Sequence, residues 1–354
     1  SSKIALSANM FARSALRVAR VAATPSVPKV SRAAFSAATQ LRNAEFVGEK
    51  KVPVVTYTHG EAQRSTFIVD QDQAKSDPDA VIPLSQEVYN AMTPSLQKMT
   101  IMGKTVIVTG AARGLGNMMA RACIEAGAKN MIIFDANPEL GVASAAELHK
   151  ATGSTIPVEF FPIDVRDAVA IEQAVAAITE KYGAPDILIN SAGIADSNIP
   201  AEKYDHEMWR RLIDINLNGS FFMSQSVGKA MMAANKPGSI VLVASMSGSI
   251  VNYPQEQSCY NASKAGVIQF GKSLAAEWAK YNIRVNCISP GYMDTALNNV
   301  PKLDGQKKIW KSLTPQGRLG AVTDLNGLAV FLSSDASAYM TGANVAIDGG
   351  YTLY

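Results

Sequence analysis

Tyr260 and Lys264 stand four positions apart at the start of a stretch with the pattern of a long helix. Residues i and i+4 lie on one helical face, about one turn apart, so the phenol and the ammonium can reach the same site. A nearby cation favours the ionised phenol, and lowering a pKa of about 10 by about 3 units takes about 4 kcal/mol. The pair could therefore move a proton at neutral pH. Taken alone, it also fits an exposed lysine beside a half-buried tyrosine.

Seven short β-branched runs alternate with Ala-rich helical segments from residue 105 onward. Continuous apolar strands that alternate with helices form a parallel sheet covered on both faces. The sequence therefore predicts an α/β fold with a doubly wound, Rossmann-type, seven-stranded parallel sheet. The predicted strands are residues 105–109, 131–135, 156–161, 187–190, 239–244, 284–288 and 344–347.

A glycine-rich loop with Gly110, Gly114 and Gly116 follows the first predicted strand and opens a helix. Glycines let the backbone turn tightly and approach a pyrophosphate, which then lies at the helix N-terminus. Asp135 ends the next predicted strand, about 20 residues further on, where a carboxylate can bind ribose hydroxyls. This spacing predicts a dinucleotide-binding site.

Asp135 and Arg113 indicate different dinucleotides. A carboxylate accepts hydrogen bonds from the ribose 2′- and 3′-hydroxyls but repels a 2′-phosphate, whereas a basic residue in the glycine loop could meet that phosphate. No lysine or arginine occupies the three positions after Asp135. We therefore expect NAD, with NADP as the alternative.

Three motifs together resemble the short-chain dehydrogenase/reductase family: the glycine pattern at 109–116, the Asn-Ser-Ala-Gly turn at 190–193 and the Tyr-x-x-x-Lys pair. The resemblance covers about residues 102–354, and the catalytic domain is expected at 101–354. Within the family, the segments 244–266, 278–286 and 348–351 resemble fungal polyol dehydrogenases, D-arabinitol 2-dehydrogenases most closely. Nothing in the family corresponds to residues 1–100.

The resemblance implies roles for the chemical groups. Tyr260 is the acid/base, Lys264 lowers its pKa and holds the nicotinamide ribose, and Ser245 hydrogen-bonds the substrate oxygen. Asn216 matches the helix residue that anchors a water for proton relay. The interval from Ser245 to Tyr260 is slightly longer than usual in the family, so Ser247 is the alternative. We prefer Ser245 because it directly follows the predicted strand.

The resemblance also implies where the dinucleotide binds. Asp164 and Val165 match the adenine position, and the turn at 190–193 matches the adenosine ribose position. The loop at 290–295 matches the segment that holds the carboxamide. The expected cofactor-binding residues are Gly110, Arg113, Gly114, Leu115, Gly116, Asp135, Asp164, Val165, Asn190, Ala192, Gly193, Tyr260, Lys264, Pro290, Gly291, Met293 and Thr295.

Polar residues suggest the substrate. The segment 252–257 lies between Ser245 and Tyr260, and Asp196 and Asn198 follow the turn at 190–193. Such groups could meet the hydroxyls of a sugar alcohol, whereas an acyl chain would need an apolar floor; a solvated loop is the alternative. We expect a polyol dehydrogenase that forms a ketose. An NADPH-dependent mitochondrial 3-oxoacyl reductase and a non-catalytic subunit of a larger assembly remain open.

Composition limits the partners. The net charge of +3 is too small to indicate nucleic acid, and no apolar run approaches the about 18 residues of a membrane span. Cys123, Cys259 and Cys287 lack metal-ligand spacing and fit free thiols in a reducing compartment. No metal is expected. The family resemblance favours a homo-tetramer.

The first hundred residues carry no recognisable chemistry. Residues 1–44 contain seven basic and no acidic residues, and an Arg- and Ser-rich amphipathic pattern of this kind is typical of a mitochondrial targeting segment; a basic tail without that role is the alternative. We therefore expect a matrix protein. Residues 45–100 are expected to form an arm, with strands at 52–57 and 65–69 and a helix at 87–99. Residues 296–320 are expected to form a lid over the substrate.

Overall fold

The computed structural model describes residues 51–58, 61–68, 81–196, 198–295, 298 and 301–354. The chain divides into two compact units between Ser76 and Asp77. In the first unit, β1 (Lys51–Thr58) and β2 (Glu61–Ile68) pair antiparallel, with Thr58 opposite Glu61. Both strands expected in this region are therefore present. The expected targeting segment at 1–44 lies outside the described residues.

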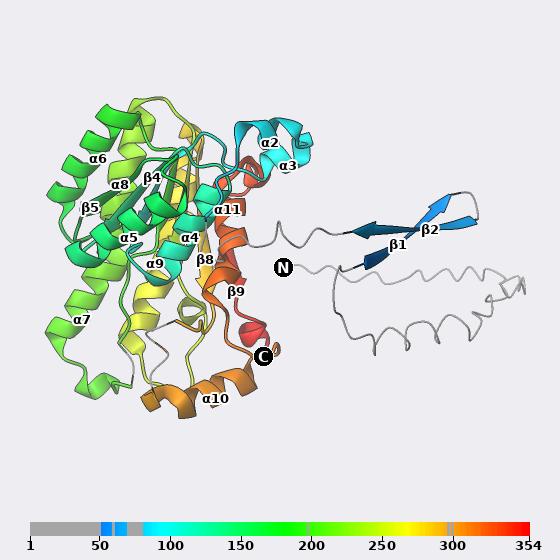
Figure 1. The fold of residues 1–354 in the computed structure, drawn as a ribbon. Coiled ribbons are helices and arrows are strands. Elements are labelled where there is room, and N and C mark those ends of the chain that lie inside the picture. Colours follow the sequence, from blue (N-terminus) through cyan, green and yellow to red (C-terminus); the bar gives the residue numbers. More distant parts are fainter. Residues whose placement is uncertain (1–50, 59–60, 69–80, 197, 296–297, 299–300) are drawn as a thin grey trace, which may run out of the picture. The chain divides into compact units, whose positions relative to one another are not determined.

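The second unit is built on a parallel sheet with the strand order β5–β4–β3–β6–β7–β8–β9 (Figure 1). This confirms the predicted seven-stranded doubly wound fold. The strand order reverses between β3 and β6, and ligands of such sheets bind at the carboxyl ends of the strands near this point. The strands are β3 (Thr105–Thr109), β4 (Asn130–Asp135), β5 (Val158–Pro162), β6 (Ile187–Asn190), β7 (Gly238–Val243), β8 (Ile283–Pro290) and β9 (Asn344–Ile347).

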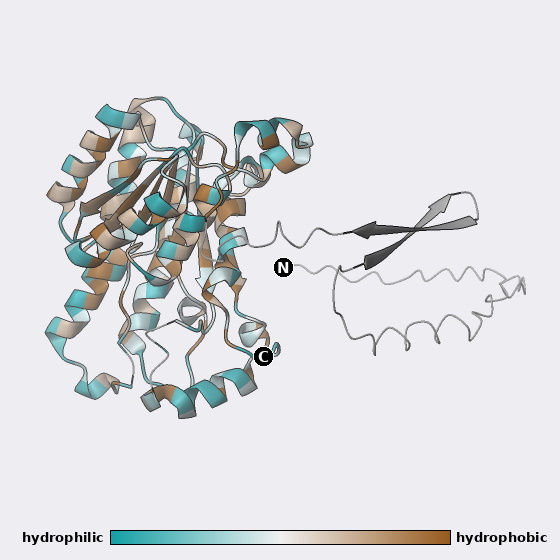
Figure 2. Cartoon of the chain, in the orientation of Figure 1, coloured by the Kyte–Doolittle hydropathy of each residue, from teal (hydrophilic) through white to brown (hydrophobic). Residues whose placement is uncertain are grey.

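Helices cover both faces of the sheet because neighbouring residues of a strand point to opposite sides. Val106 and Val108 of β3 pack with α4, α5 and α11, whereas Ile107 between them packs with α6, α8 and α9. Figure 2 shows the resulting apolar strands between helices with hydrophilic outer faces. The helices are α4 (Gly114–Glu125), α5 (Pro138–Ala151), α6 (Ala168–Tyr182), α7 (His206–Ile213), α8 (Gly219–Ala233), α9 (Ser258–Trp278), α10 (Asp304–Leu313) and α11 (Asn326–Ser333).

The helix expected at 87–99 is two helices, α2 (Gln86–Ala91) and α3 (Pro94–Lys98). Pro94 causes the break, since proline cannot donate a backbone hydrogen bond and restricts the residue before it to an extended conformation. Thr93 is extended, with φ −65° and ψ 154°. Both helices belong to the second unit, so the expected arm at 45–100 is divided between the two units.

None of the helices in the described part of the chain has the length and apolarity needed to cross a membrane. All three cysteines are buried and free.

Candidate active site

Ser245, Tyr260 and Lys264 converge beyond the carboxyl end of β7. Ser245 caps a short 3-10 helix (Met246–Gly248), and its Oγ accepts a hydrogen bond of 3.1 Å from the Ser247 N–H. Tyr260 lies in the first turn of α9, close enough to interact with Ser245. Lys264 follows one turn later, with its Nζ 5.7 Å from the centroid of the Tyr260 ring. The helical spacing thus brings the phenol and the amine to the strand end that carries Ser245.

Burial dominates the electrostatics of this group. It raises the pKa of Tyr260, and the interaction with Ser245 opposes this rise. Burial lowers the pKa of Lys264 to about 8. The Lys264 amine donates a 2.8 Å hydrogen bond to the Val243 carbonyl. Tyr260 is a neutral phenol at pH 7, the form that can donate a proton to a carbonyl oxygen.

Asn216 lies in a π-helical turn (Asp214–Asn218, η4) between α7 and α8. Its side chain accepts from the Ile194 N–H and donates to the Ile194 carbonyl, both at 2.9 Å, and it also donates to Ser263 Oγ at 3.1 Å. π-helical turns frequently occur at functional sites. Asn216 therefore ties the segment after β6 to α9, one residue away from Lys264.

The glycine loop is shaped by close contacts. Gly110 has φ +64°, and a Cβ there would lie 2.8 Å from Ala192 Cα; a Cβ at Gly116 would lie 2.4 Å from the Gly110 carbonyl oxygen. Gly114 has φ +63°, but a Cβ there would meet nothing within 4 Å. Two glycines thus permit tight backbone packing, whereas Gly114 leaves open space at the N-terminus of α4. A pyrophosphate group fits such a cradle.

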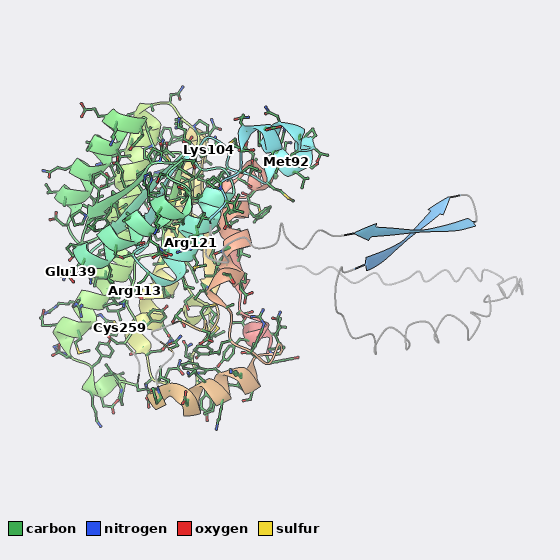
Figure 3. All side chains as sticks on the ribbon, in the orientation of Figure 1. Met92, Lys104, Arg113, Arg121, Glu139 and Cys259 are labelled. Atoms are coloured by element: carbon green, nitrogen blue, oxygen red, sulfur yellow. The ribbon has the colours of Figure 1, made fainter. Side chains whose placement is uncertain are left out.

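Asp135 lies at the end of β4 beside this loop. Its carboxylate accepts hydrogen bonds from the Ala112 N–H at 3.1 Å and the Asn137 N–H at 3.0 Å. Arg113 is exposed at the start of α4. In Figure 3, Arg113 and Cys259 lie toward the same end of the sheet, whereas Lys104, which precedes β3, lies toward the opposite end. The sheet therefore brings the glycine loop and the start of α9 to one edge.

Asn190 and Thr109 join the central strands at this edge. Thr109 Oγ1 donates to Asn190 Oδ1 at 2.9 Å and accepts from the N–H groups of Ser191 and Ala192. Asn190 Nδ2 donates to the Ser220 carbonyl at 3.1 Å. Both polar groups of Asn190 are therefore occupied within the protein. The sequence analysis predicted no role for Thr109, although its position at a strand end, directly before Gly110, could have indicated one.

The remaining cofactor candidates occupy different settings. Val165 and Met293 are buried, and Leu115 packs against the core. The Asp164 carboxylate pairs with Arg166, which lowers its pKa. Pro290 ends β8, and a Cβ at Gly291 would lie 2.7 Å from Asp348 Cα; a Cβ at Gly193 would lie 3.6 Å from Lys264 Nζ. Thr295 follows Met293 and donates its N–H to the Met293 carbonyl.

Tyr292 holds a polar and aromatic cover together. Its hydroxyl accepts from Asn252 Nδ2 at 2.9 Å and from Gln255 Nε2 at 2.8 Å, and its ring stacks on Trp310 at 4.2 Å. Trp310, in α10, donates its indole N–H to Gln255 Oε1 at 3.1 Å. The helix α10 is thereby attached to the loop between Ser245 and Tyr260. The expected lid at 296–320 is described only in part, and α10 is its main element.

The other end of α10 reaches the segment after β6. Gln306 donates to Asn198 Oδ1 at 2.6 Å, and the Ile199 N–H donates to the Glu256 carbonyl at 3.2 Å. Asp196 accepts a 2.8 Å hydrogen bond from the Tyr204 hydroxyl. Asp196 and Asn198, expected to meet substrate hydroxyls, are thus partly engaged by the protein. The segments around them are nevertheless polar.

Comparisons with known proteins agree with this architecture. Residues 110–352 match the family described as enoyl-(acyl carrier protein) reductase. A ribulose-forming D-arabinitol 2-dehydrogenase from Candida tropicalis is 39% identical over 279 residues, which cover 75% of this chain and 97% of that protein. An NADP-dependent mannitol dehydrogenase from Hypocrea jecorina is 39% identical over 259 residues, with coverages of 73% and 95%. The crystal structure of gox2181 aligns with a TM-score of 0.70 at 38% identity, covering 73% of this chain and 100% of that one. The chain belongs to the short-chain dehydrogenase/reductase family.

Proposed function

We propose that this chain is an NAD-dependent polyol dehydrogenase, which interconverts a secondary alcohol of a pentitol or hexitol and the corresponding ketose. The observation that carries the proposal is the convergence of Ser245, Tyr260 and Lys264 next to a polar loop covered by α10. The relatives whose names contain D-arabinitol and mannitol support the substrate class. D-arabinitol is the first substrate to test, followed by mannitol and sorbitol.

The side chains supply proton transfer and orientation. When bound, the nicotinamide dinucleotide accepts hydride from the carbinol carbon or returns it to the carbonyl carbon. In ketose reduction, the neutral Tyr260 phenol gives its proton to the carbonyl oxygen, and Ser245 donates a hydrogen bond to the same oxygen. The Lys264 ammonium stabilises the phenolate that forms. Oxidation of the polyol is the reverse reaction and begins from the phenolate.

The preference for NAD rests on Asp135. Its carboxylate is held at the rim of the glycine loop by two backbone N–H groups, in the place where it could accept from ribose hydroxyls. Arg113 and the NADP-dependent relative favour the other dinucleotide. A 3-oxoacyl substrate is less compatible with the polar loop at 252–257, since an acyl chain needs apolar contacts.

A substrate panel tests the proposal. Reduction of NAD and NADP is measured with each polyol, and reduction of a 3-oxoacyl thioester is measured in parallel. Tyr260→Phe should lower kcat for polyol oxidation by about 10²- to 10⁴-fold, because it removes the proton carrier. Tyr281→Phe, at an exposed tyrosine, should leave kcat unchanged. Turnover of the acyl substrate alone, or of none of these substrates, would contradict the proposal.

The cellular setting is proposed from composition and family. We propose a mitochondrial matrix location from the basic, acid-free residues 1–44, and a homo-tetramer from the family resemblance. Import of a fusion to residues 1–44 into isolated mitochondria tests the location. Light scattering on the purified protein tests the assembly.

A further inference from the structure

A chain of buried polar groups leads from Ser245 through Ser247 to Gln257. Ser245 Oγ and Ser247 Oγ lie 3.1 Å apart, and Gln257 Nε2 lies 3.3 Å from Ser247 Oγ. The three residues are 7%, 4% and 8% exposed. Because water has little access to them, the hydrogen bonds among these groups decide where each hydroxyl proton points.

The donor and acceptor capacities limit the arrangement. A hydroxyl has one proton and two acceptor positions, whereas an amide NH₂ can only donate. Gln257 Nε2 must therefore donate to Ser247 Oγ, and the Ser247 N–H already donates to Ser245 Oγ. In this structure the Ser245 hydroxyl donates to Ser247 Oγ. When the Ser245 proton turns to a substrate oxygen, the Ser247 hydroxyl can donate to Ser245 Oγ in return, which fills both acceptor positions of Ser245. The only remaining capacity of Ser245 is then its own proton, which must point outward.

Gln257 favours this arrangement of hydrogen bonds. Donation from Gln257 to Ser247 also polarises the Ser247 hydroxyl and makes it a better donor to Ser245. Gln257 Nε2 also lies 3.2 Å from Asn261 Oδ1, next to Tyr260 on α9, and can donate its second hydrogen there. Gln257 therefore connects the loop that carries Ser245 with the helix that carries Tyr260.

We propose that Gln257 is a positioning residue that acts through Ser247 to direct the hydroxyl proton of Ser245 toward the substrate oxygen. The order of donation is Gln257 to Ser247, Ser247 to Ser245, and Ser245 to the substrate. Gln257 itself does not contact the reacting atoms. This role also gives Ser247 a function different from that of an alternative catalytic serine. The inference rests on the proposed function, since it concerns the reaction at the same site.

Gln257→Glu is the sharpest perturbation. The size of the side chain is kept, but an ionised carboxylate can only accept, so the Ser247 proton turns away from Ser245. We expect kcat to fall about 10- to 30-fold while KM for the polyol or ketose changes less than about 3-fold. Protonation of the introduced carboxylate restores a donor, so kcat should partly recover as the pH falls below about 5. Gln269→Glu, the same change on the exposed face of α9, is the control and should show neither effect.

A double-mutant cycle tests the route through Ser247. Ser247→Ala alone should lower kcat about 10-fold, and Gln257→Glu should then add less than about 3-fold in the Ser247→Ala background. Dinucleotide binding and the thermal midpoint, measured for every variant, show whether the protein remains folded. A full effect of Gln257→Glu without Ser247, or an effect on KM alone, would overturn the proposal. So would an unchanged kcat in Ser247→Ala.

The failure of this inference is separable from that of the proposed function. The cycle is run with whichever alcohol or carbonyl compound the unmodified protein turns over in the substrate panel. If only a 3-oxoacyl compound is turned over, the polyol proposal fails but the relay is still measured. If a polyol is turned over and the two substitutions act independently, the relay fails alone.

Discussion

Removing the carboxylate of Asp135 should change the choice of dinucleotide. The carboxylate is half-buried at the end of β4 and is oriented by the N–H groups of Ala112 and Asn137. Asp135→Asn removes the charge and keeps an acceptor oxygen for one of these groups. Asp135→Ala removes the charge and both acceptors. The two variants therefore separate repulsion of a 2′-phosphate from recognition of the ribose hydroxyls.

The expected magnitudes follow from this setting. A unit charge about 4 Å from the carboxylate is repelled by about 4 kcal/mol at an effective dielectric constant of about 20. Solvent screening of a half-buried carboxylate reduces this to about 2 kcal/mol. Asp135→Asn should thus raise the NADP-to-NAD ratio of kcat/KM by about 30-fold. Asp135→Ala also removes the acceptor for a ribose hydroxyl of NAD. Loss of one hydrogen bond to a charged acceptor costs about 1.5–3 kcal/mol, so the ratio should rise by about a further 10- to 10²-fold.

The assay compares kcat/KM for the two dinucleotides with one polyol at fixed ionic strength. Glu139→Gln is the matched control, because Glu139 is an exposed acidic residue in the first turn of α5. It should change the ratio by less than about 3-fold. Arg113→Ala should lower the use of NADP. A ratio unchanged in both Asp135 variants would refute the assigned role of this carboxylate.

Two further predictions concern the chemistry and the cover. Burial lowers the pKa of Lys264 to about 8, so its ammonium is lost as the pH rises through that value. We therefore expect kcat/KM for ketose reduction to fall above about pH 8. A flat pH profile up to about pH 10 would contradict this. Trp310→Phe keeps a ring to stack on Tyr292 but removes the indole donor to Gln255. The free energy of unfolding should therefore fall by about 1–2 kcal/mol. KM for the polyol should rise severalfold, whereas dinucleotide binding should be unchanged. Equal effects on dinucleotide and polyol binding would show that α10 is not a substrate cover.

The order of the elements and the two ends of the site could be predicted from the sequence. Apolar runs of strand length that alternate with helical segments are local features, and they predicted the seven-stranded sheet. The glycine spacing was equally informative, since Gly110 and Gly116 must lack a side chain for β3 and α4 to pack as they do. The break between α2 and α3 was missed because Pro94 was treated as part of one helix.

Other features depended on contacts between distant segments. Local spacing placed Tyr260 beside Lys264, but only the packed structure showed that burial raises the pKa of the phenol and that the amine donates to Val243. Likewise, 37 residues separate Tyr292 from Gln255 and 55 separate Gln255 from Trp310. The groups that stand at the ends of the strands and helices could be read from the amino-acid sequence, because backbone periodicity is local. The tertiary structure decided their protonation and hydrogen-bond partners, because desolvation and hydrogen bonding depend on every segment that packs around them.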